Sequence, residues 1–67
     1  MNNQEIEQYI HEMLASCNNI EFPTICRRQM TVAGKNYIIN RIIHLVTKDG
    51  LPIESTLAHI EQELNGL

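Results

Sequence analysis

The chain has 67 residues, of which 43% are hydrophobic and 19% charged, and its formal net charge is −3. This length allows one small domain, which we expect to span residues 1–67. A chain of this size buries only about 60% of the surface that it exposes when unfolded. Natural chains this short often need a disulfide, a metal ion or a partner chain, so the sequence is expected to show signs of one of them.

The two cysteines, Cys17 and Cys26, are expected to be free thiols. The opening residues MNNQEIEQYIHEML have no basic segment followed by an unbroken apolar run, so they do not look like an export signal. Cysteines in a chain without such a signal usually stay reduced. No apolar run approaches the roughly 18 residues that span a membrane. We therefore expect a cytoplasmic protein with no membrane segment.

The charges fall into three blocks along the chain. Residues 1–21 hold four Asp or Glu and no Lys or Arg. Residues 22–48 hold five Lys or Arg and no Asp or Glu, and residues 49–67 hold four Asp or Glu and no Lys or Arg. Such blocks can pair within one fold, pair between subunits or present a basic face to a polyanion. We expect pairing within or between chains, because it neutralises the acidic ends.

The first predicted element is a helix over residues 3–17. Six side chains recur at helical spacing and form one apolar face, with two of them at its edges. The segment CNNIEFP should end this helix, because asparagines favour turns and Pro23 restricts Phe22 to extended geometry. The face consists of Ile6, Tyr9, Ile10, Met13, Leu14 and Cys17, and Tyr9 and Met13 are the edge residues.

The segment over residues 24–33 admits two interpretations. As a short helix, it would be capped by Thr24 and terminated by Gly34. As a strand, RQMTV would form a hairpin with the residues after Gly34. We favour the helix, because the next segment is clearly helical and leaves such a strand little to pair with.

Residues 36–48 are predicted to form the central helix. At about 100° per residue, six apolar side chains fill one continuous arc of roughly 160°, which is wider than an ordinary surface helix shows. The polar side chains fill the remainder without interleaving. The arc consists of Ile38, Ile39, Ile42, Ile43, Leu45 and Val46.

A final helix is predicted over residues 52–65. Gly50 fits the left-handed position after the central helix, and Pro52 fits the first turn of the next one. Ile53, Leu57, Ile60 and Leu64 form a narrow apolar seam, with Glu54, Glu61, Gln62 and Glu63 on the expected solvated side. The predicted fold class is all-α, with three helices and a short fourth.

The turn LVTKDG with Pro52 and Ile53 resembles the helix–turn–helix ending of small enterobacterial stress and biofilm regulators.

The wide apolar arc of the central helix predicts a homodimer. Two neighbouring helices with narrow apolar faces leave part of such an arc uncovered, and a second subunit is the simplest cover. The alternative is that residues 24–33 close over the arc and the chain is monomeric.

The sequence gives no sign of catalysis, of a cofactor, or of a metal or small-molecule site. Zinc ligands normally come in pairs at short spacing, whereas the histidines and cysteines here are scattered one per segment. A chain of this size has little volume for an enzymatic pocket. We therefore expect a non-enzymatic protein with no cofactor, no bound metal and no small-molecule substrate.

Two surfaces are candidates for binding a partner. One is a basic strip on the central helix with two arginines before it, and the other is the acidic final helix, which could dock on a basic partner. We expect a regulator, inhibitor or adaptor that binds another protein. The alternative is a nucleic-acid-associated regulator that uses the basic strip. The final helix carries no Lys or Arg, so DNA phosphates would repel it and it suits a DNA-reading helix poorly. The basic strip consists of Arg27, Arg28, Tyr37, Arg41, His44 and Lys48.

Overall fold

The computed structural model describes residues 3–66 and confirms the predicted all-α class. Within this range every secondary-structure element is a helix, and the central helix is the longest. No helix in the described part of the chain is long and apolar enough to cross a lipid bilayer. The elements are α1 (Asn3–Ser16), α2 (Pro23–Arg28), α3 (Val32–Thr47), the 3₁₀ helix η1 (Ile53–Ser55) and α4 (Thr56–Asn65).

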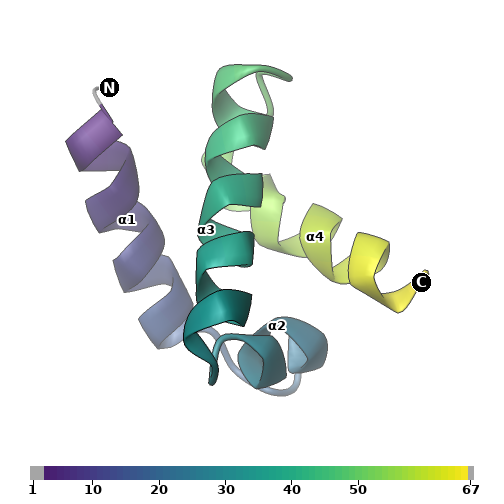
Figure 1. The fold of residues 1–67 in the computed structure, drawn as a ribbon. Coiled ribbons are helices and arrows are strands. Elements are labelled where there is room, and N and C mark those ends of the chain that lie inside the picture. Colours follow the sequence, from purple (N-terminus) through teal and green to yellow (C-terminus); the bar gives the residue numbers. More distant parts are fainter. Residues whose placement is uncertain (1–2, 67) are drawn as a thin grey trace.

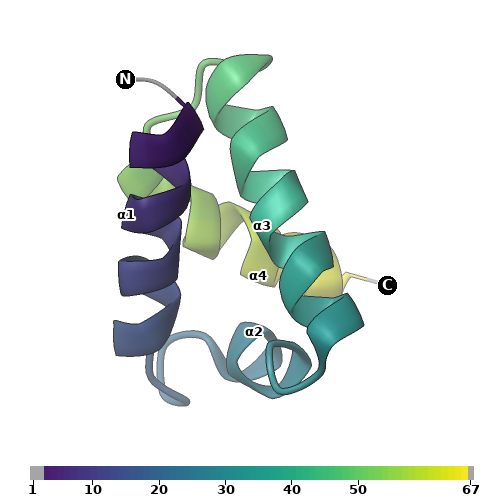
Figure 2. The same cartoon turned by 60° about the vertical axis from the view of Figure 1, so that its left-hand side comes forward.

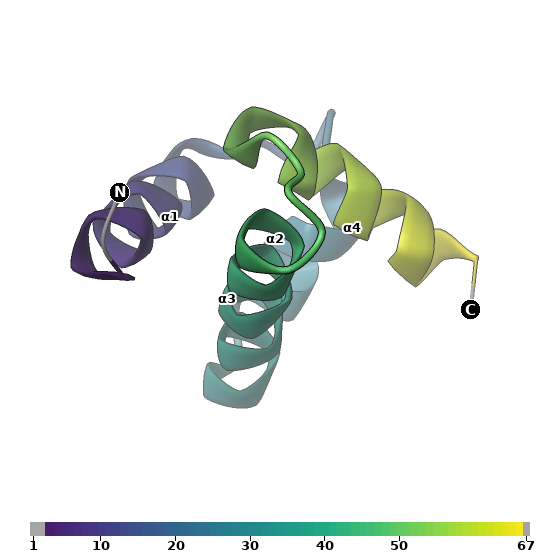
Figure 3. The same cartoon turned by 90° about the horizontal axis from the view of Figure 1, so that it is seen from above.

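The helices surround one core. α1 and α3 run antiparallel beside each other, and the short α2 lies across the end where α1 finishes and α3 begins (Figures 1 and 2). α4 crosses α3 at a steep angle, and the view from above shows α1 and α4 splayed on either side of α3 (Figure 3). Each helix turns one apolar face inward. The buried core consists of Ile6, Ile10, Leu14, Ile25, Ile38, Ile42, Leu45, Leu57, Ile60 and Leu64.

The boundary between α2 and α3 differs from the prediction. α2 ends at Arg28, and α3 begins at Val32, four residues earlier than expected. Thr31 caps α3, because its backbone is extended and its Oγ1 accepts a hydrogen bond from the N–H of Gly34 at 3.0 Å. Gly34 therefore lies in the first turn of α3, and the prediction that it ends the second helix is wrong.

Gly34 is required by close packing rather than by an unusual backbone angle. A Cβ at this position would lie 2.1 Å from the backbone oxygen of Arg28 and 2.8 Å from Thr31 Oγ1. Real Cβ atoms do not come this close to a carbonyl oxygen. The three-residue connection from α2 to α3 can be this tight only because position 34 has no side chain.

Glu61 is buried, which corrects its predicted place on the solvated side of the last helix. Only 7% of its surface is exposed. Its carboxylate accepts hydrogen bonds from the N–H groups of Thr24 (3.1 Å) and Ile25 (3.0 Å) and from Asn65 Nδ2 (3.0 Å). Since Phe22 gives α2 no side-chain cap, this carboxylate from α4 satisfies two of the N–H groups at the start of α2.

The hydrogen bonds to Glu61 decide its ionisation. Burial by itself would raise the pKa of this carboxyl group, but the N–H groups of Ile25 and Thr24, together with Asn65, lower it below its usual value. Glu61 is therefore ionised at neutral pH, and its negative charge lies at the positive end of α2.

In the connection between α3 and α4, the prediction for Gly50 is confirmed and the prediction for Pro52 is wrong. Gly50 is in the left-handed region with φ of 68°, and the N–H of Leu51 donates to the oxygen of Leu45 at 3.0 Å. Pro52 then precedes η1 rather than lying in the first turn of an α-helix. The predicted helix over residues 52–65 is thus a 3₁₀ turn followed by α4.

Candidate functional site

An open groove lies beside α1, where the α1–α2 loop and the start of η1 and α4 meet it. It consists of two adjoining hollows of about 240 and 290 Å³, which share the side chains of Tyr9, Met13 and Ser16. We call it the α1 groove. Its lining residues are Tyr9, Glu12, Met13, Ser16, Cys17, Glu21, Phe22, Glu54 and Leu57.

The α1 groove combines an apolar floor with an acidic rim. The floor is formed by Tyr9, which is 38% exposed, with Met13, Phe22 and Leu57. The rim carries the exposed carboxylates of Glu12, Glu21 and Glu54, and no basic residue lines the groove in the described part of the chain. Such a surface suits the apolar face of a segment that also carries positive charge.

The local sequence explains how the α1–α2 loop forms the wall of the groove that contains Glu21 and Phe22. The side-chain oxygen of Asn18 accepts hydrogen bonds from the N–H groups of Ile20 (3.0 Å) and Glu21 (2.8 Å), which turns the chain directly after α1. The N–H of Phe22 also donates to the backbone oxygen of Asn18 at 3.0 Å. The turn brings Glu21 and Phe22 back beside α1.

The basic strip is only partly a continuous surface. On α3, Tyr37 and His44 are exposed, and Lys48, which caps the end of the helix, is exposed too, as the helical spacing predicts. Arg27 and Arg28 are exposed in the last turn of α2, which is a separate helix that crosses the end of α3. The strip is therefore divided between two elements that point in different directions.

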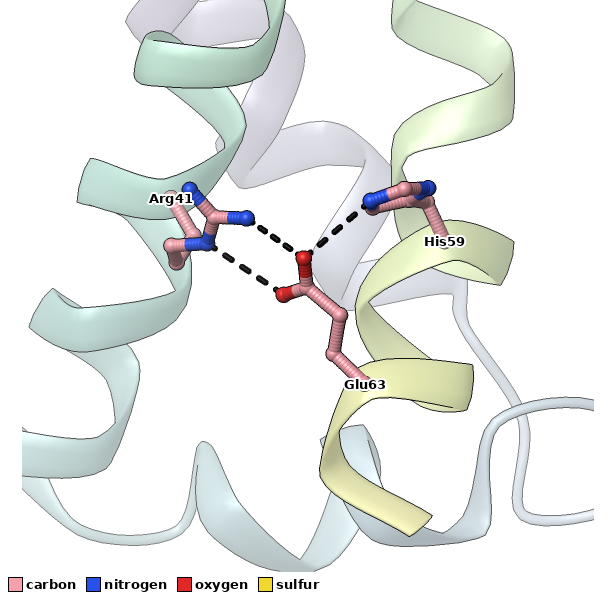
Figure 4. A network of polar contacts seen from close by, with 3 residues as sticks. All are labelled: Arg41, His59 and Glu63. Atoms are coloured by element: carbon pink, nitrogen blue, oxygen red, sulfur yellow. Dashed lines mark hydrogen bonds and ion pairs between the residues drawn. The ribbon is translucent and has the colours of Figure 1, made fainter. Parts of the chain in front are cut away.

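Arg41 is turned away from the strip and toward α4. Its guanidinium binds the carboxylate of Glu63 through two nitrogens, with Nε donating to Oε2 at 3.3 Å and Nη2 donating to Oε1 (Figure 4). His59 Nε2 lies 3.1 Å from the same Oε1. The hydrogen bond from Arg41 lowers the pKa of Glu63. This contact pairs the basic block with the last acidic block inside one chain, as one of the alternatives predicts.

The wide apolar arc of α3 is divided between core and partial cover. Ile38, Ile42 and Leu45 are buried in the core of the single chain. Ile39, Ile43 and Val46 are partly buried and pack against that core. The single chain therefore covers more of this apolar arc than the homodimer prediction assumed. The homodimer stays a prediction.

Sequence patterns give part of the α1 groove. The helical spacing places Tyr9 and Met13 at the edges of the apolar face of α1. The two acidic blocks, at the start and the end of the chain, supply the glutamates of the rim. The positions of Phe22 and Leu57 depend on how the loop and α4 pack against α1, and no local pattern contains that information.

Neither the arrangement of possible metal ligands nor the comparisons with known proteins assign a function to the chain. Among residues 3–66, no three His, Cys, Asp or Glu side chains form a group that could hold a metal ion. No protein-family model, curated protein or solved structure matches the chain.

Proposed function

We propose that the protein is a small non-enzymatic regulatory, inhibitor or adaptor protein of the cytoplasm that acts by binding another protein through the α1 groove. The observation that supports this proposal is the apolar floor of Tyr9, Met13, Phe22 and Leu57 inside an acidic rim. Tyr9 is exposed, Met13 and Phe22 are partly buried, and Leu57 is buried beneath them. A hollow lined mainly by apolar and aromatic side chains with a few polar groups is typical of binding sites.

The chemistry of the groove favours a basic amphipathic segment as its ligand. Apolar anchors of such a segment would fill the hollows beside Tyr9 and Met13, while its lysine or arginine side chains would face Glu12, Glu21 and Glu54. The rim charges would speed encounter and exclude acidic partners, and the buried anchors would supply most of the affinity.

A synthetic amphipathic peptide tests this proposal. A helical peptide with lysine on one face and leucine on the other should bind at low ionic strength and shift the NMR signals of Tyr9 and Met13. Changing Glu21→Lys and Glu54→Lys together should weaken binding by at least about tenfold, because attraction at the rim becomes repulsion. The same peptide with glutamate in place of lysine should not bind.

The matched control is Glu7→Lys, at an exposed α1 position that does not line the groove. It alters net charge in the same direction as the rim substitutions and should leave peptide binding nearly unchanged. Equal weakening per charge by Glu7→Lys would show that only net charge matters and would remove the groove from the proposal.

A nucleic-acid role for the basic strip is the alternative. The exposed side chains of Arg27, Arg28 and Lys48 favour it, whereas the pairing of Arg41 with Glu63 counts against it. Binding of duplex DNA at about 50 mM salt, where phosphate contacts are strong, and its loss on Lys48→Glu would favour this alternative over the groove.

The homodimer is a further part of the proposal. Val32, which is 80% exposed, continues the partly buried row of Ile39, Ile43 and Val46 along α3. A second copy that packs on this row would cover it. Light scattering at micromolar concentration should then give twice the chain mass, and Val32→Glu should reduce it to one chain. A single-chain mass for the unchanged protein would contradict the dimer.

A further inference from the structure

Cys17 and Cys26 lie side by side although nothing in their spacing along the chain predicts it. Cys17 directly follows α1, and Cys26 lies in α2. Their sulfur atoms are 2.9 Å apart and share a thiol hydrogen bond. Both are free thiols and both are partly exposed, so a small reagent in solution can reach them.

Neighbouring contacts hold the two thiols in place. Gln29 Nε2 donates to the backbone oxygen of Leu14 at 3.2 Å and to Cys17 Sγ at 3.3 Å, which fixes the end of α1. The N–H of Cys26 donates to the oxygen of Phe22 at 2.9 Å, and the Glu61 carboxylate anchors the start of the same helix. The fold itself therefore brings the two sulfurs together before any covalent bond forms.

We propose that Cys17 and Cys26 form a reversible intramolecular disulfide, with a small-molecule disulfide as the oxidant. In the first step, the thiolate of one cysteine attacks a sulfur of the oxidant and releases one small thiol. In the second, the other cysteine attacks the protein sulfur of this mixed disulfide and releases the second small thiol. Two electrons pass to the oxidant, and the two protons lost by the cysteines end on the two small thiols.

The environment of Cys17 makes the exchange dependent on pH. Burial, followed by the hydrogen bond and the charge of Cys26, raises the pKa of the Cys17 thiol to about 11. Only the thiolate attacks, so exchange is slow at neutral pH and faster in mild alkali. Once Cys26 is held in a mixed disulfide it carries no negative charge, so its charge no longer opposes ionisation of the Cys17 thiol that attacks in the second step.

The disulfide would act on one defined part of the fold. It closes the loop over residues 17–26, which contains Glu21 and Phe22 of the α1 groove. Closing a loop of this length restricts the unfolded chain, and we expect the melting temperature to rise by on the order of 10 °C. This inference is independent of the proposed function, because it concerns the thiols whether or not the groove binds a partner.

The experiment uses the whole chain at low concentration with oxidised glutathione at mildly alkaline pH. The unchanged protein should lose the mass of two hydrogen atoms, lose both titratable thiols and melt at a higher temperature, and dithiothreitol should reverse all three changes. Cys17→Ser and Cys26→Ser should each stop at a single glutathione adduct, because the second sulfur is missing.

Three results would overturn the proposal. The unchanged protein could keep both thiols, it could form only glutathione adducts or cross-linked chains, or its oxidised form could melt no higher than the reduced form. Since each result is measured on the unchanged protein, poor folding of a serine variant would not obscure the outcome.

Discussion

Replacing Glu61 by glutamine should lower the free energy of unfolding by about 3 kcal/mol. The amide has one acceptor oxygen where the carboxylate has two, so the N–H of Thr24 or Ile25 would face an NH₂ group in a buried site. A small domain loses about 4–8 °C of melting temperature for each kcal/mol. Thermal unfolding followed by circular dichroism should therefore show a fall of roughly 15 °C.

The matched control is Glu63→Gln, two residues further along α4. Its carboxylate is partly exposed and pairs with Arg41 and His59 at the surface. Because exposed ion pairs contribute about 1 kcal/mol or less, this variant should melt within a few degrees of the unchanged protein. Equal losses from the two substitutions would show that the buried carboxylate has no special role.

The effect of Glu61 should also depend on pH. Its folded pKa lies below the value of 4.5 that an unperturbed glutamate has, so the folded state holds the carboxylate more strongly than the unfolded state does. The contribution of Glu61 to the free energy of unfolding is complete above about pH 4.5 and is lost as the pH falls through the pKa of the folded state. The difference in stability between the unchanged protein and Glu61→Gln should shrink in acid, and an unchanged difference there would contradict this explanation.

Replacing Gly34 by alanine should destabilise the protein by about 3 kcal/mol, although the same change stabilises most helix interiors by about 1 kcal/mol. The added Cβ would lie 2.1 Å from the backbone oxygen of Arg28, which no side-chain rotation can relieve. The corner between α2 and α3 would have to open, which would break the Thr31 cap and loosen the packing of α2.

Gly66→Ala is the control for this substitution. A Cβ there would lie 3.5 Å from the nearest atom, the oxygen of Gln62, which is an ordinary contact. Chemical denaturation should place Gly66→Ala within about 0.5 kcal/mol of the unchanged protein. A Gly34→Ala variant as stable as Gly66→Ala would show that the corner is not as tight as described.

Periodic apolar spacing predicts α1, α3 and α4, because one face of each helix must be buried. Gly50 is also predictable, since a residue that follows a helix in left-handed geometry is usually glycine. Gly34 is misplaced by the same rule, because glycine serves close packing as well as helix ends. Only the assembled corner shows which role applies.

The misplacement of Glu61 has a different cause. Helical spacing puts it near the acidic face of α4, and a glutamate is buried only where it has partners. Two of its partners are backbone N–H groups 36 and 37 residues earlier in the chain, and backbone groups leave no trace in a sequence. The third, Asn65, lies four residues later and by itself does not indicate that the pair is buried. The pairing of Arg41 with Glu63 is visible only as matching charge blocks, which name no specific pair.

The cap that Glu61 provides also has a consequence for the order of folding during synthesis. α2 has six residues, too few to be stable as an isolated helix. Its first turn is completed by a carboxylate that lies 36 and 37 residues further along the chain than the two N–H groups it binds. Until α4 is released, α2 and the corner that leads into α3 lack their anchor, so the nascent chain cannot reach its final fold one helix at a time.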